Sequence, residues 1–143
     1  MKQKEHEIDE QRTFKQLRPY ILCIGLIITE RGIYWTSQAD KAAKDSPLYQ
    51  NMHEVMNLFF WGIPFTIGGL CIILSLFAYN YRKVNNWYSI LTIVGGFTSS
   101  IFFGIITLAS MYDALNWLSP LTFLTIAVCT GSAALTGVFY YRR

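Results

Sequence analysis

Glu30 and Arg31 are the residues of this sequence whose types and position most strongly suggest chemistry. They interrupt an apolar run that begins at Tyr20 and resumes at Gly32. Counting from Tyr20 at 1.5 Å per helical residue places the pair about 15 Å along a helix, near the middle of a bilayer or somewhat beyond it. Ionisable side chains at that depth mark ion paths, proton relays or polar pockets.

The partners of this pair must come from other segments. Adjacent helical residues diverge by about 100°, so Glu30 and Arg31 are not expected to neutralise each other. The polar groups expected near the same end of neighbouring helices are His53, Glu54, Asn57 and Asp113. One interpretation is an intramembrane polar site made of Glu30, Arg31, Glu54 and Asn57. The other is that the first helix lies obliquely, Arg31 snorkels outward and the pair locks two helices together.

Small residues recur in two later apolar runs at the spacing that lets helix backbones approach closely in lipid. These helix-packing candidates are Gly96, Ser100, Gly104, Gly131 and Gly137. Packing within one bundle and self-association between copies both remain open as explanations.

Enzymatic signatures are absent from the sequence. His6 and His53 lie far apart, and the cysteines at 23, 71 and 129 fall in separate apolar runs with no Cys-x-x-Cys pair. No nucleophile elbow or phosphate loop is present. We therefore expect no catalytic residue, no metal and no cofactor. The basic residues flank apolar runs and form no groove-like patch, which argues against nucleic acid as a partner.

The composition is that of a membrane protein. Of the 143 residues, 52% are hydrophobic and 15% charged, against about 25% charged in soluble domains. A bilayer core needs about 20 helical residues. We expect an all-α integral membrane protein with four transmembrane helices in an antiparallel bundle, at about residues 19–37, 55–79, 88–111 and 120–141. Residues 1–18 would remain as a charged tail before the 19–143 membrane domain, and 47–56 would form an amphipathic lead-in at the outer surface.

Prolines and charges refine this scheme. Pro19, Pro47 and Pro120 each follow Arg or Ser, and proline is favoured at the first helical position, so helices are expected to begin there. Because Glu30 and Arg31 make the first span marginal on its own, we expect it to insert as a hairpin with the second.

The distribution of basic residues predicts the orientation. Placing both termini in the cytoplasm leaves only Lys41 and Lys44 outside, as the positive-inside rule favours for a multi-pass plasma membrane protein. The basic residues then on the cytoplasmic side are Lys2, Lys4, Arg12, Lys15, Arg18, Arg82, Lys83, Arg142 and Arg143.

The chain resembles small four-span membrane proteins encoded by phages and prophages of Gram-positive bacteria. The resemblance rests on size, topology, the charged tail and two stretches, Asp45-Ser46-Pro47-Leu48-Tyr49 and Leu115-Asn116-Trp117-Leu118-Ser119-Pro120. It implies a holin-like protein that forms oligomeric membrane lesions, or a phage accessory protein that acts on a host membrane protein.

The chain is also similar to the small multidrug resistance exporters, which have four short helices and a glutamate embedded in the first. Glu30 would take that role, which implies proton-coupled transport. Arg31 beside it, the loop at 38–46 and the long tail depart from that pattern.

The leading hypothesis is a non-enzymatic integral membrane protein that acts by helix association, as a homo-oligomer or with a host membrane protein in the lipid bilayer. The alternative is a small proton-coupled transporter or channel that uses Glu30.

Overall fold

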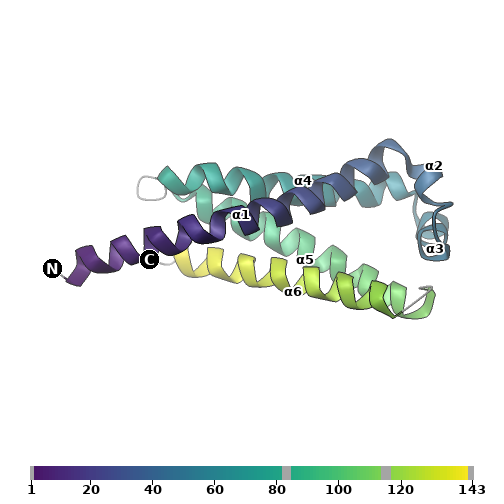
Figure 1. The fold of residues 1–143 in the computed structure, drawn as a ribbon. Helices are drawn as coiled ribbons and strands as arrows, with labels where there is room; N and C mark the ends of the chain where they lie inside the picture. Colours follow the sequence, from purple (N-terminus) through teal and green to yellow (C-terminus); the bar gives the residue numbers. More distant parts are fainter. Residues whose placement is uncertain (1, 82–84, 114–116, 142–143) are drawn as a thin grey trace.

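Every regular element of the computed structural model is a helix within the part that it describes, residues 2–81, 85–113 and 117–141. The prediction of an all-α protein is thereby confirmed. Four long helices run side by side (Figure 1): α1 Lys2–Ser37, α4 Leu58–Ala78, α5 Trp87–Asp113 and α6 Leu118–Tyr141. Two short helices, α2 Ala39–Ala42 and α3 Pro47–Val55, connect α1 to α4, and the short turn η1 Tyr79–Tyr81 extends α4.

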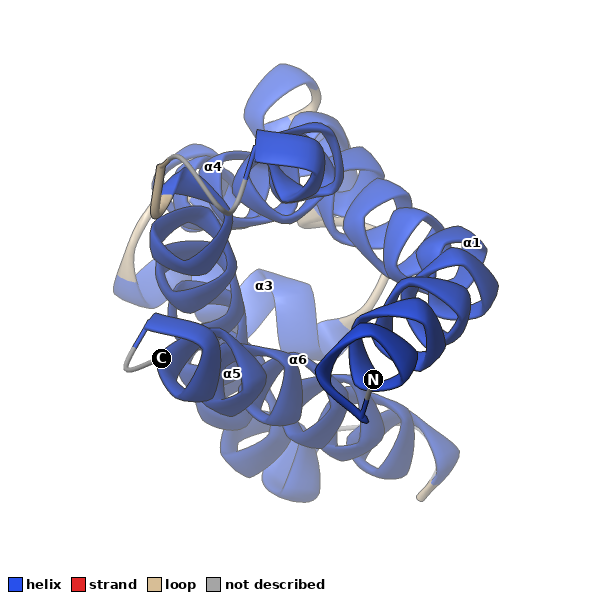
Figure 2. Ribbon diagram, turned by 90° about the vertical axis from the view of Figure 1, so that its left-hand side faces the viewer, coloured by secondary structure: helices blue, strands red, loops and turns tan. Residues whose placement is uncertain are grey.

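The long helices pack in the order α1, α4, α5 and α6. Each packs extensively on the next, whereas α1 and α6 have at most a marginal contact with each other. Figure 2 looks along the helices and shows α3 lying across their far end. The edge of the array between α1 and α6 is therefore only loosely packed.

Three helices are long and apolar enough to cross a membrane within the described residues: Leu58–Tyr81, Trp87–Tyr112 and Leu118–Phe139. The sequence predicted four such spans, and α1 is not among the three. Its apolar stretch is interrupted by Glu30 and Arg31 and is preceded by a charged region, so composition alone does not qualify it.

The outward faces of the long helices are apolar. Large side chains that are at least half exposed occur on each of them, for example Ile67 and Leu74 on α4, Ile101 and Leu108 on α5, and Val128 on α6. Soluble monomers rarely expose contiguous apolar surface of this extent. A lipid environment therefore suits this surface.

Two of the three helix starts predicted from proline were wrong. α1 begins at Lys2 and continues through Pro19, because the preceding residues are mostly strong helix formers such as Glu, Gln and Lys. α6 begins at Leu118, two residues before Pro120. α3 does begin at Pro47, and the Ser46 side chain accepts a hydrogen bond from the amide of Tyr49.

The amphipathic lead-in predicted at 47–56 is a separate helix. α3 ends at Val55, the backbone is extended at Met56, and Asn57 begins α4 as its N-cap. α3 buries Leu48 and Met52 against the ends of the long helices.

Several predicted topology residues lie outside the described part of the chain. They are Arg82, Lys83, Leu115, Asn116, Arg142 and Arg143.

Candidate functional site

Two pairs of glycines bring α1 directly against α4. A Cβ added to Gly32 would lie 2.8 Å from the carbonyl oxygen of Gly62, and one added to Gly62 would lie 2.7 Å from the carbonyl oxygen of Gly32. Two turns further along, a Cβ on Gly69 would lie 2.8 Å from the carbonyl oxygen of Gly25. Such backbone contact allows no other residue type without displacement. It therefore determines which face of α1 turns toward α4.

This rotation sends Glu30 and Arg31 in different directions. Arg31 falls on the inward stripe of α1 with Ile28 and Trp35, which are 0% and 1% exposed. Glu30 is exposed on the outward face. The adjacent charges thus lie in separate environments, as the helical geometry predicts.

The Arg31 guanidinium lies among aromatic rings inside the array. Its central carbon is 5.1 Å from the centre of the Phe123 ring on α6 and 5.9 Å from that of Trp35. Both distances are within the range of cation-π attraction. Its Nη1 atom is buried and has no hydrogen-bond partner in the described chain. Arg31 is therefore a cation with unused donors.

Trp35 and Phe123 belong to a cluster of aromatic rings that come from five helices. Trp35 makes edge-to-face contacts with Tyr49 of α3 at 5.4 Å and Phe65 of α4 at 5.3 Å between ring centres. Phe65 in turn contacts Phe103 of α5 at 4.7 Å, and Phe103 lies 6.3 Å from Phe123. None of these rings supplies a negative charge that could pair with the Arg31 guanidinium.

Three of the four partners expected for Arg31 are engaged elsewhere or exposed, and the side chain of the fourth, Asp113, lies outside the described part of the structure. The His53 Nδ1 accepts a hydrogen bond from the Leu58 amide, and its Nε2 lies 3.9 Å from the Asp40 carboxylate. Asn57 caps α4 by accepting from the Phe59 amide at 2.9 Å. Glu54 is exposed on α3.

The four residues of the intramembrane site expected from the sequence therefore take separate roles. Within the described chain, no hydrogen bond or ion pair joins any two of Glu30, Arg31, Glu54 and Asn57. Nor do three His, Cys, Asp or Glu side chains gather there as a metal site would require. The candidate position that remains is the Glu30–Arg31 pair, in which Arg31 faces inward and Glu30 faces outward.

Four of the five helix-packing residues lie in the α5–α6 contact. Ser100 donates a hydrogen bond to the Ala127 carbonyl at 2.9 Å, and a Cβ on Gly131 would lie 2.9 Å from the Ser100 hydroxyl. Gly96 and Gly137 likewise face the partner helix. Gly104 has no such neighbour within 4 Å. These small residues thus support packing within the chain.

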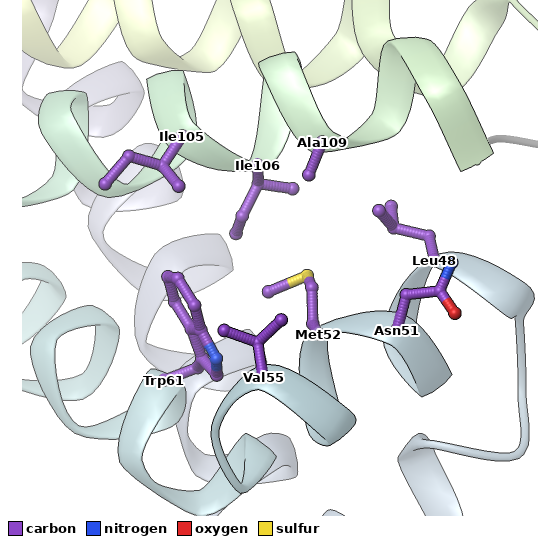
Figure 3. A pocket seen from close by; sticks show the side chains of 8 residues that line it. All are labelled: Leu48, Asn51, Met52, Val55, Trp61, Ile105, Ile106 and Ala109. Carbon is purple, nitrogen blue, oxygen red and sulfur yellow. The ribbon is translucent and has the colours of Figure 1, made fainter.

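A separate apolar cavity of about 250 Å³ lies under α3 (Figure 3). Its walls come from α3, α4 and α5: Leu48, Asn51, Met52, Val55, Trp61, Ile105, Ile106 and Ala109. The Trp61 indole nitrogen is buried and has no partner in the described chain. Arg31 is not among the lining residues, so this cavity does not serve the cation.

The spacing of the glycines in the sequence is itself a signal for the two glycine pairs. Gly25 and Gly32 are seven residues apart, and so are Gly62 and Gly69. Seven residues are close to two helical turns, which puts both glycines of a pair on one face. The contact of Arg31 with Phe123 had no comparable signal, because the two residues are far apart in sequence.

Comparison with known proteins did not identify relatives: no family model, curated protein or solved structure matches this chain.

Proposed function

We propose that this chain is a non-enzymatic integral membrane protein with four spans and both ends in the cytoplasm. It acts by helix association between copies through the outward face of α1. The observation that carries this proposal is the exposed position of Glu30 on an otherwise apolar surface.

The packing of α1 supports the fourth span. Phe14 stacks on Tyr79, just beyond the last residue of α4, and Gly32 meets Gly62, one turn inside its first residue. The helical rise from Phe14 to Gly32 is about 27 Å, close to the thickness of a bilayer core. A bilayer that surrounds α4 would therefore also surround α1. The close glycine contacts allow the marginal first span to insert together with the second.

The charges at the two ends of α1 support the orientation. Arg12, Lys15 and Arg18 are exposed near the end of α1 that meets Tyr79, whereas Lys41 and Lys44 follow its other end. The end with more positive charge would lie in the cytoplasm.

The surroundings of Glu30 support association. Leu26, Ile27 and Ile33 are 51%, 52% and 51% exposed on the same side of α1. A carboxyl group facing lipid alone is unfavourable. When protonated, it both donates and accepts hydrogen bonds, so two copies related by a twofold axis can pair their Glu30 side chains. This surface is therefore complementary to itself.

The test is self-association in lipid vesicles, measured by energy transfer between copies carrying donor and acceptor dyes. Glu30→Ala should weaken association about tenfold, the equivalent of one interhelical hydrogen-bond pair. Glu30→Gln should retain it, because an amide also donates and accepts. Glu54→Ala, which removes an exposed carboxylate from α3, is the matched control. If Glu30→Ala associated as strongly as the wild type, the proposal would be overturned.

Holin-like activity is the most specific form of this proposal, and it follows from the resemblance to phage-encoded proteins. Leakage of a trapped dye from vesicles that contain wild-type protein, with less leakage from Glu30→Ala, would support it. Association without leakage would favour an accessory role, with a host membrane protein as the partner.

The second candidate is a proton-coupled transporter. The outward position of Glu30 favours a site formed between two copies, where the carboxyl groups would exchange a proton for a cation. Proton release on adding a hydrophobic cation, abolished in Glu30→Gln, would establish transport. Because that variant should still associate, the experiment separates the two functions.

A further inference from the structure

We propose that Arg31 is an anion site that binds a phosphate group, from a phospholipid or from free phosphate, at the edge between α1 and α6. The site lies on the inward stripe of α1. It uses none of the outward residues that carry the proposed association. The two proposals therefore stand or fall separately.

The Arg31 side chain requires an acceptor that the described chain does not supply. A guanidinium remains charged at any physiological pH and carries five N–H donors. Its Nη1 is buried without a partner, and no carboxylate among the described side chains forms an ion pair with it. A cation in this position is stabilised by an oxyanion that accepts its donors.

The aromatic neighbours hold the guanidinium but leave its donors unused. Phe123 and Trp35 lie 5.1 and 5.9 Å from its central carbon. Rings attract a cation through their electron-rich faces, but they provide no strong acceptor for N–H groups. The planar fork of an arginine matches two oxygens of a phosphate group. The rings would thus orient Arg31 for such a ligand.

The packing order provides a route for the ligand. α1 is held by α4 and α6 by α5, whereas α1 and α6 have little contact, and the Arg31–Phe123 contact crosses that edge. In Figure 2, α1 and α6 are the first and last helices around the array. A ligand entering here would separate no extensively packed helix pair.

The depth of the site suits a phosphate from the membrane surface. Phe123 is five residues beyond Leu118, where α6 begins, which corresponds to about 8 Å along the helix. Long arginine side chains can extend toward the surface over such distances. Every phospholipid carries a phosphate, so this anion is present wherever the protein is inserted.

The experiment measures thermal unfolding of delipidated full-length protein in a neutral maltoside detergent. Phosphatidylglycerol is added in one series and inorganic phosphate in another. A ligand that binds only the folded protein raises the unfolding temperature. We expect phosphate compounds to raise that of the wild type, and to bind Arg31→Met at least about tenfold more weakly. Arg12→Met removes an exposed arginine of the same helix and should respond like the wild type.

A further variant keeps the test decisive if Arg31→Met does not fold. Arg31→Lys keeps the charge but loses the planar fork, and it should bind with an affinity between those of the wild type and Arg31→Met. A response to phosphatidylglycerol alone identifies a lipid site, and a response to both identifies a site for free phosphate. Equal responses in wild type and Arg31→Lys would overturn recognition by the fork.

Two other outcomes would overturn the proposal. The first is a wild type that responds to neither compound. The second is a Glu30→Gln variant that loses the response as fully as Arg31→Met, because the response would then not be specific to Arg31. Loss of association in Glu30→Ala with an intact phosphate response would affect only the proposed function.

Discussion

Gly32 of α1 and Gly62 of α4 face each other so closely that a methyl group on either would come within 2.8 Å of the other's carbonyl oxygen. The contact is reciprocal and involves backbone, which cannot move aside as a flexible side chain can. It fixes the rotation of α1 one residue away from Arg31. The position of the inward cation therefore depends on two residues without side chains.

Replacing Gly32 by alanine should lower the free energy of unfolding by about 1–3 kcal/mol, the usual effect of overpacking. The expected loss of stability is opposite in sign to the effect of helix propensity, which favours alanine over glycine by about 1 kcal/mol. Gly104→Ala is the control, because nothing lies within 4 Å of the added Cβ, and it should be neutral or stabilising. Both can be measured by titrating maltoside micelles with dodecyl sulfate. Equal stability of the two variants would contradict the contact.

Replacing Phe14 by alanine should detach the first turns of α1 from the other helices. Phe14 stacks on Tyr79 and meets Tyr88 edge to face at 6.0 Å. We expect a loss of about 1–3 kcal/mol, because Phe14 is only partly buried, and faster amide exchange before Arg18. Leu17→Ala, at a position 49% exposed, should change both much less. Unchanged exchange in Phe14→Ala would show that this docking contributes no stability.

Replacing Asn57 by alanine should destabilise the start of α4. The Asn57 side chain accepts from the Phe59 amide at 2.9 Å, and loss of an N-cap costs about 1 kcal/mol. Asn57→Asp should retain the stability, because a carboxylate accepts the same bond and favours the helix N-terminus. Unfolding of the two variants side by side tests this. A stable Asn57→Ala would mean that water replaces the cap.

Labelling of single cysteines should establish the orientation of α1. With the native cysteines replaced by serine, Lys44→Cys should react with a membrane-impermeant maleimide on intact cells. Lys15→Cys should react only after the membrane is opened, because a span lies between the two positions. Labelling of both on intact cells would contradict the fourth span.

The sequence by itself determined the features that depend on local composition. The apolar runs predicted α4, α5 and α6 because each is long enough for a bilayer and nearly free of charge. Ser46 and Pro47 predicted the start of α3 because capping involves neighbouring residues only. The starts expected at Pro19 and Pro120 were wrong because proline is tolerated within the first turn of a helix and, with support from other contacts, further inside it.

Only the tertiary structure decided what Glu30 and Arg31 face. Their divergence follows from the helix, but which of them turns inward depends on the rotation of α1 against α4. That rotation comes from glycines on two helices, and Phe123 reaches Arg31 from a third. Hydropathy cannot determine such contacts, because it sums residues along the chain. The close approach of the α1 and α4 backbones therefore decides that Arg31, and not Glu30, faces inward.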